Sequence, residues 1–318
     1  MKKIYLNIYK ANFFNLKKAK KYIENNNIIG LPTETVYGLA GNAYSNASVK
    51  KIYDLKKRPN FNPLIVHYYG LNALKKDVVL NKNFIKIYEA LCPGPITFIL
   101  NKKKKSNISK YVSAGKSTLA VRFPKHTVAR KLLKILNVPL AAPSANMSSK
   151  LSPTSAQDVV DEFKNKIKLV IDGGRCKIGL ESTIIDLTKK PNILRQGYIS
   201  KKKIHQILKV KVTDKPSSKI IIAPGQLNSH YSPGIPIFMN KRKPKLNEAF
   251  ITFGKKYKSG KNRFNLSKNG NLNEAGNNLY RVMRKIKKKN YKSIIVAKIP
   301  KIGVGLAIND RLKKASYK

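Results

Sequence analysis

The stretch that decides the fold runs from residue 30 to residue 67 and reads GLPTETVYGLAGNAY (30–44), then a segment with helical spacing (45–57), then RPNFNPLIVH (58–67). Apolar residues at 28–31 and 63–67 predict two short strands. Between them Ser45 is a suitable N-cap for a helix, and Pro59 limits where that helix can end. A strand, a helix and a second strand in succession predict an α/β arrangement.

The same stretch carries polar groups at its strand ends. Thr33, Thr35 and Tyr37 alternate, so an extended backbone places their hydroxyls on one side, where they can bind an amino acid or a sugar. The alternative is a strand edge with solvated hydroxyls. Lys56 and Arg58 come where the helix must end, and such cations either interact with the helix dipole or bind phosphate.

Strand-like and helix-like segments continue to alternate along the first two-thirds of the chain. We expect strands at 96–100, 119–123, 139–142, 169–172 and 183–187, and helices at 127–136 and from a capping box at 154–157 to about 163. The first residues, 1–14, read as a first strand and not as a signal peptide. This alternation predicts a central sheet in an α/β domain over residues 1–213.

The pattern changes near residue 211. Residues 214–235 are rich in Ser, Pro, Gly and Lys and are predicted to be a linker. Beyond them, strand patterns at 249–253 and 293–299 and helical patterns at 272–286 and from 305 onward predict a smaller α/β domain over 236–318.

Composition narrows the class of protein. The chain has 318 residues, 42% of them hydrophobic, and no apolar run approaches the length of a membrane span. Its two cysteines give neither a disulfide framework nor a metal-ligand spacing, so a cytoplasmic location is the default. The net charge of +51 indicates either a polyanionic partner or a compositional bias toward lysine spread over solvated faces.

Other polar side chains also come at strand boundaries, where sheet folds place ligand sites. They are Thr118, Arg122, Ser144, Asn146, Ser182 and Arg195. The run SAGKST (113–118) is not a P-loop, because it precedes a strand and lacks the first glycine. The acids Glu34 and Glu181 have no partner nearby in sequence. Without a catalytic dyad or a metal cage, the predicted chemistry depends on positioning and cations, as nucleotidyl transfer does.

Taken together these segments resemble the threonylcarbamoyl-AMP synthase family, in its two-domain form known as Sua5, whose first domain is of the YrdC type. The motifs that carry the resemblance are PTETVYGL (32–39), Lys56-x-Arg58 with NPLIVH (62–67), PGPITFIL (93–100), AVRFP (120–124), AAPSAN (141–146), SPT (152–154), IDGG (171–174), ESTIIDL (181–187), LRQG (194–197), APGQLNSHYSP (223–233) and GVGLAINDRLKKAS (303–316). They cover nearly the whole chain, in order.

The resemblance implies a twisted, largely open α/β sheet followed by a smaller Rossmann-like domain, with the linker crossing the active site. It also implies a reaction in which L-threonine, bicarbonate or CO2, and ATP give threonylcarbamoyl-AMP and pyrophosphate. The product serves N6-threonylcarbamoylation of adenosine 37 in tRNA by a downstream transferase. Mg2+ is expected to come with ATP, without a metal site on the protein.

The resemblance also implies roles for individual residues. For L-threonine they are Thr35, His67, Arg122, Ala142 and Ser182. For ATP they are Arg58, Asn62, Thr118, Ser144, Ser152, Arg195 and Asn228, with Lys56 and Arg58 as the catalytic cations. Asn228 stands where the family commonly has an aromatic residue, so the linker departs from the family pattern there.

Two alternatives belong to other classes. The basic charge favours a non-catalytic protein that binds double-stranded RNA, although such a protein does not need a threonine-sized pocket. A carbamoyl-transfer enzyme of the hydrogenase-maturation type needs zinc-finger cysteines and an acylphosphatase domain, which this sequence lacks.

Overall fold

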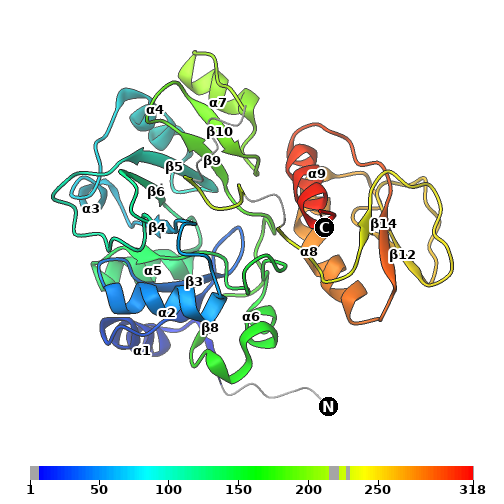
Figure 1. Ribbon diagram of the computed structural model, residues 1–318, viewed down its shortest axis with the longest axis horizontal. Coiled ribbons are helices and arrows are strands. Elements are labelled where there is room, and N and C mark those ends of the chain that lie inside the picture. Colours follow the sequence, from blue (N-terminus) through cyan, green and yellow to red (C-terminus); the bar gives the residue numbers. More distant parts are fainter. Residues whose placement is uncertain (1–6, 215–221, 227–229, 318) are drawn as a thin grey trace.

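The computed structural model describes residues 7–214, 222–226 and 230–317, and in these ranges the chain forms two sheets (Figure 1). The larger sheet is mixed, and its ten strands all lie before residue 196. Their order across the sheet is β1 (Ile8–Lys10), β8 (Val170–Asp172), β2 (Ile29–Leu31), β3 (Gly38–Asn42), β7 (Leu140–Ala141), β4 (Ile65–His67), β6 (Thr118–Arg122), β5 (Ile96–Asn101), β9 (Thr183–Asp186) and β10 (Asn192–Arg195).

Helices cover the two faces of this sheet unequally. One face packs against α2 (Asn46–Lys56), α3 (Leu71–Leu74), α4 (Lys82–Leu91), α6 (Ala156–Phe163) and α7 (Lys201–Leu208). The other packs against α1 (Phe13–Glu24) and α5 (Thr127–Leu136), over β1, β8, β2, β3 and β7. Successive strand residues point to opposite faces, so Val66 joins the first core while Ile65 faces the other side.

No described helix covers the other half of that second face, so side chains on it are accessible to a ligand. A small apolar cluster lies there, with one residue from each of the four neighbouring strands β4, β6, β5 and β9, namely Ile65, Ala120, Ile99 and Ile184. Ala223, from the segment predicted as linker, completes the cluster. A segment between the two sheets therefore packs directly on the large sheet beside the side chains that follow these strands.

The smaller sheet is wholly parallel. Its strand order is β11 (Ile237–Phe238), β14 (Ser293–Val296), β12 (Glu248–Thr252) and β13 (Arg263–Asn265). Its core contains α8 (Leu272–Lys287) and α9 (Val304–Ala315). Figure 1 shows both helices on the side of this sheet that faces the larger domain. None of the described helices combines the length and apolar character needed to cross a membrane.

The expected fold class is confirmed, with a mixed α/β sheet followed by a smaller parallel one. The strand order divides between Arg195 and Ile237, so the predicted linker falls between the sheets. Residues 215–221 and 227–229 of that linker lie outside the described residues, and the boundaries at 213 and 235 stay predictions.

The predicted N-terminal caps of α2 and α6 have different outcomes. Ser45 caps α2 as predicted, because its side chain accepts a hydrogen bond from the Ser48 backbone N–H. The capping box of α6 is one residue later than predicted and pairs Ser155 with Asp158. Asp158 fits the box because its carboxylate also accepts hydrogen bonds from the backbone and hydroxyl of Thr154.

Residues 33–37 are also not the alternating strand that the sequence predicts. The chain bends, and the Thr33 hydroxyl donates to the Val36 carbonyl at 2.6 Å while lying 2.9 Å from the Thr35 hydroxyl. Tyr37 does not share their side, because its hydroxyl donates to the Gly174 carbonyl at 2.7 Å. Local hydrogen bonds from threonine have replaced the strand ladder.

Candidate active site

A pocket lies at the part of the large sheet that no described helix covers. Predicted site residues that line it are Thr35, Arg58, His67, Arg122, Ala142, Ser144, Ser182 and Arg195. They come from segments up to 160 residues apart in sequence. The sheet brings them together because their strands end at neighbouring positions.

One end of the pocket is built around Arg122, the last residue of β6. Its guanidinium Nη2 donates to Glu34 Oε1 at 2.8 Å, and Glu34 Oε2 accepts from the Lys125 backbone N–H at 3.0 Å. Both side chains are buried. Within the described residues Arg122 Nε has no hydrogen-bond partner, so part of this guanidinium is available to an anionic ligand. We call this the Arg122 end.

Hydroxyl groups and an imidazole complete the Arg122 end. The Ser182 and Thr97 hydroxyls lie 2.7 Å apart. His67 follows Ile65 on the same face of β4 and is 2% exposed. Burial, together with the charge of Arg122, holds the pKa of His67 well below 6.5, so its imidazole is neutral at physiological pH. This end therefore presents neutral hydrogen-bonding groups beside one paired arginine.

The opposite end is built around Arg58 and Arg195, and we call it the Arg195 end. Arg58 is held by Asn62, whose carbonyl and side-chain oxygen accept from Nε at 2.9 Å and Nη2 at 2.6 Å. Burial lowers the pKa of Arg58 to about 10, which still leaves it charged at neutral pH. Asn62 is not among the pocket-lining residues, so in this structure its contact with the pocket runs through Arg58.

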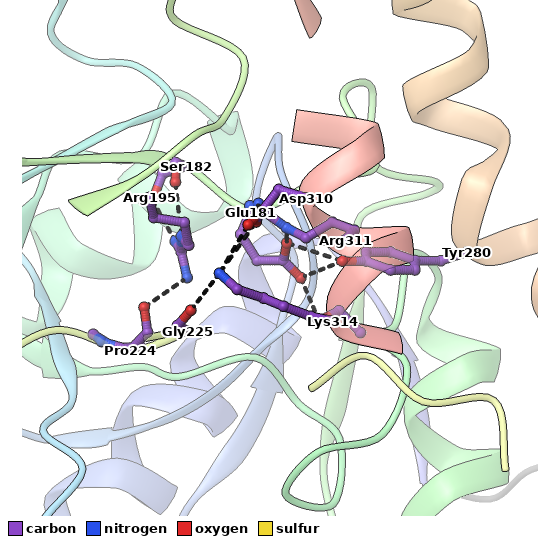
Figure 2. Close-up of polar contacts among 10 residues, drawn as sticks. Glu181, Ser182, Arg195, Pro224, Gly225, Tyr280, Asp310, Arg311 and Lys314 are labelled. Carbon is purple, nitrogen blue, oxygen red and sulfur yellow. Dashed lines mark hydrogen bonds and ion pairs between the residues drawn. The ribbon is translucent and has the colours of Figure 1, made fainter. Parts of the chain in front are cut away.

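Arg195 ends β10 and reaches back across the sheet. Its Nε donates to the Ser182 carbonyl at 3.0 Å and its Nη2 to the Ser182 hydroxyl at 3.1 Å. Gly197 allows this close packing, because a Cβ there would lie 2.3 Å from the Thr183 backbone nitrogen. Ser182 therefore belongs to both ends of the pocket, and Figure 2 shows it beside Arg195.

Lys56 lies beneath the pocket and not in its wall. Its ammonium donates to the carbonyls of Ser144, at 2.5 Å, and of Asn146. Its side chain is 1% exposed, and burial lowers its pKa well below 10.5. In this structure the lysine holds the 144–146 turn in place, and direct contact with a triphosphate stays a prediction.

Two further predicted residues also lie away from the pocket lining. Thr118 begins β6 and pairs with Asn101 of β5. Ser152 donates its hydroxyl to Glu181 Oε1 at 2.5 Å. Asn228 lies outside the described residues.

The segment between the sheets closes the Arg195 end. Pro224, Gly225, His230 and Tyr231 line the pocket there, and Arg195 Nη1 lies 3.5 Å from the Pro224 carbonyl. His230 and Tyr231 are buried with ring centroids 4.0 Å apart. Burial lowers the pKa of His230 to about 3, so this histidine is neutral at physiological pH.

Sequence reasoning left Glu34 and Glu181 without partners, and the structure places both acids in or beside the pocket wall. Glu34 pairs with Arg122 across 88 residues, and Glu181 pairs with Arg311 across 130 residues. A signal existed for the first pair, since an arginine that ends an apolar strand needs an anion. No comparable sequence pattern indicated that Glu181 would pair with Arg311.

The fold and pocket define a class of protein, namely a two-domain α/β protein with a small buried site between an arginine–glutamate pair and a cationic wall. Comparison with known proteins narrows the class. Residues 21–197 match the family model described as Telomere recombination, and residues 199–316 match the model of the threonylcarbamoyl-AMP synthase C-terminal domain. The chain belongs to the threonylcarbamoyl-AMP synthase family.

Individual relatives agree over nearly the whole length. The threonylcarbamoyl-AMP synthases of Pyrococcus abyssi and Bacillus subtilis are each 33% identical to this chain over 95% of its length, and the matches cover 94% and 92% of those proteins. The crystal structure of P. abyssi Sua5 complexed with L-threonine superposes with a TM-score of 0.88 at 30% identity, covering 98% of this chain and 97% of that one.

Proposed function

We propose that this protein is a nucleotidyltransferase that makes L-threonylcarbamoyl-AMP and pyrophosphate from L-threonine, bicarbonate or CO2, and ATP. The observation that carries the proposal is one pocket with two chemically different ends. The Arg122 end offers hydroxyls and a paired arginine, which suits an amino acid. The Arg195 end offers cations, which suits a polyphosphate. A relative that shares both domains is crystallised with L-threonine.

The proposed chemistry has two steps. The threonine amine attacks CO2 and loses a proton, which forms an N–C bond and an anionic carbamate. A carbamate oxygen then attacks the α-phosphorus of ATP, so that an O–P bond forms, the α–β phosphoanhydride bond breaks, and pyrophosphate leaves. The carbamate is already an anion and needs no general base in the second step. The pocket contributes orientation and charge.

The following roles are proposed for the individual residues. At the Arg122 end, L-threonine is held by Thr35, His67, Arg122, Ala142 and Ser182. At the Arg195 end, ATP is held by Arg58, Ser144 and Arg195, with Thr118, Asn62, Ser152 and Asn228 as the remaining expected contributors. Lys56 is proposed to act on ATP through the turn at Ser144 that its ammonium holds.

Mg2+ is proposed to arrive with ATP and to offset charge on the leaving pyrophosphate. The carboxylates in and beside the pocket wall are already engaged by arginines, Glu181 by Arg311 and Glu34 by Arg122. Over residues 7–214, 222–226 and 230–317 no cluster of three or more His, Cys, Asp or Glu is grouped to hold a metal ion. The triphosphate oxygens are therefore the expected ligands.

The proposal is tested by pyrophosphate release from ATP in the presence of L-threonine and bicarbonate, with each component omitted in turn. We expect release only in the complete mixture, together with a threonyl-bearing adenylate detectable by mass spectrometry. Arg281→Ala, a change at an exposed arginine on α8, is the matched control and should leave turnover unchanged. Turnover that is indifferent to threonine would disprove the proposal.

A protein that only binds double-stranded RNA is not favoured, because the chain matches an enzyme family over both domains. We propose that the product passes to a tRNA threonylcarbamoyl transferase in the cytoplasm, where ATP and tRNA meet. Direct binding of tRNA to this protein stays a prediction.

A further inference from the structure

Glu181 is an acid of the pocket wall with two partners from the other domain. It precedes Ser182 in the loop before β9 and is 5% exposed. Its Oε2 accepts from Arg311 Nε at 2.8 Å, and both of its oxygens lie 3.0 Å from the Tyr280 hydroxyl. Tyr280 belongs to α8 and Arg311 to α9, so the smaller domain supplies both contacts (Figure 2).

Arg311 is buried as deeply as the carboxylate that it binds. It is 1% exposed, its Nη1 donates to Asp310 at 2.6 Å, and its guanidinium lies 5.0 Å from the ring centroid of Tyr231. Tyr231 belongs to the segment that closes the Arg195 end. One side chain of α9 therefore contacts both the pocket wall and the segment that covers it.

A second arginine stands on the other side of Glu181. Figure 2 shows Arg195 and Arg311 flanking the carboxylate. Burial by itself raises the pKa of Glu181, but the charges of Arg311 and then Arg195 bring it down to about 2, so the group is an anion at neutral pH. Yet the hydrogen bonds of Arg195 go to Ser182 and toward Pro224, while those of the carboxylate go to Arg311, Tyr280 and Ser152.

We propose that Arg311 is a positioning residue for the nucleotide: it neutralises Glu181 and thereby leaves the charge of Arg195 for the polyphosphate. Without Arg311, Glu181 is a buried anion, and Arg195 is the other arginine whose charge acts on it. Pairing between those two would draw Arg195 from Ser182 and cancel its charge toward a ligand. The smaller domain thus completes the Arg195 end. The identity of the ligand rests on the proposed function.

Joining the two domains is not the main task of this pair, because other contacts do that. Arg284 of α8 donates to the Leu151 carbonyl at 2.5 Å and lies 3.7 Å from Asp158. Lys314 donates to the Gly225 carbonyl at 2.8 Å. Arg284 makes an arginine–carboxylate contact between the domains without lining the pocket, which makes it a matched control.

The test is the affinity of the full-length chain for Mg·ATP, measured by titration calorimetry without threonine. The variants are Arg311→Met, Glu181→Gln, the double variant and Arg284→Met, each checked for folding by circular dichroism. We expect Arg311→Met to weaken binding at least fivefold and the double variant to bind within threefold of the parent protein. Arg284→Met should also bind within threefold.

Recovery in the double variant separates charge cancellation from simple loss of packing, since removing a second buried contact does not repair a packing defect. A loss under fivefold in Arg311→Met, a double variant no tighter than Arg311→Met, or a parent protein that does not bind Mg·ATP would overturn the inference. A parent protein that binds Mg·ATP but releases no pyrophosphate with threonine and bicarbonate would instead disprove the proposed function.

Discussion

Two arginines occupy opposite ends of one pocket, and their relation to a neighbouring glutamate differs. Arg122 is bound directly by Glu34 at 2.8 Å. Arg195 also has a glutamate beside it, but Glu181 is bound at 2.8 Å by Arg311 from the other domain. At the first end the arginine charge is balanced locally. At the second end Arg311 balances the charge of Glu181 from outside the pocket, so the charge of Arg195 is left for a ligand.

The difference matches the ligands proposed for the two ends. A balanced arginine offers directional N–H donors with little net charge, which suits the single carboxylate of an amino acid. An arginine that is not cancelled suits a triphosphate, whose several negative charges need a net positive wall. The same contrast disfavours the polyanion at the Arg122 end, because the Glu34 carboxylate lies behind the arginine there.

The largest effect is expected from Arg122→Ala. The change removes the guanidinium proposed to bind the threonine carboxylate and leaves Glu34 without its charge partner. We expect kcat/KM for threonine to fall by a factor that corresponds to about 2–5 kcal/mol of lost transition-state stabilisation, because the change breaks a buried charge pair. Steady-state pyrophosphate release at varied threonine and saturating ATP measures it. The apparent KM for ATP should change little, and a defect confined to ATP would contradict the assignment.

Arg58→Ala tests the other end. It removes a preorganised cation that Asn62 holds toward the pocket, so the barrier to turnover should rise by about 2–4 kcal/mol. The measurement is kcat and KM for ATP at saturating threonine. Asn62→Ala is a milder companion change that keeps the charge but loosens its support. Kinetics equal to those of the parent protein would remove Arg58 from the site.

Acid unfolding sharpens the comparison through Glu181. Its pKa of about 2 in the folded chain lies below its usual 4.5, so its ionised form stabilises the fold above pH 4.5. That stabilisation, about 3 kcal/mol, is lost as the pH falls through 2. Denaturant unfolding at pH 5 and pH 2 should show a larger loss in the parent protein than in Glu181→Gln by about this amount. Equal losses would contradict the pairing.

The smallest effect is expected from Lys56→Met, which acts behind the pocket wall. The change leaves the carbonyls of Ser144 and Asn146 without their donor, so the free energy of unfolding should fall by about 1–3 kcal/mol. Denaturant titration measures the stability, and Mg·ATP calorimetry measures the affinity. If affinity fell as far as in Arg58→Ala while stability held, Lys56 would belong in direct contact with ATP.

Local sequence signals predicted much of the fold. Helix α5 begins and ends where the apolar spacing places it, and α2 begins after the serine expected to cap it. Helix α1 was not predicted, because its first residues, Phe13 and Phe14, are exposed and blur the apolar face. The bend at 33–37 escaped because threonine side chains bond the backbone there, which an alternating pattern does not reveal.

The candidate site was predictable in composition and less so in pairing. Strand ends pointed to Arg122, Ser182 and Arg195, since residues at strand ends gather at one part of a sheet. Which acid faces which arginine depends on tertiary packing, within the larger domain for Glu34 and Arg122 and between the domains for Glu181 and Arg311. Local sequence patterns do not specify such pairs, so the pairing of Glu181 with Arg311 came from the structure alone.

Glu181 and Ser182 are consecutive residues with hydrogen-bond partners in different domains. Glu181 binds Arg311 of the smaller domain, and Ser182 binds Arg195 of the larger one. The pocket is consequently not a self-contained module. A fragment that contained only the larger sheet would keep the Glu181 carboxylate beside Arg195 and would lack Arg311, which neutralises it.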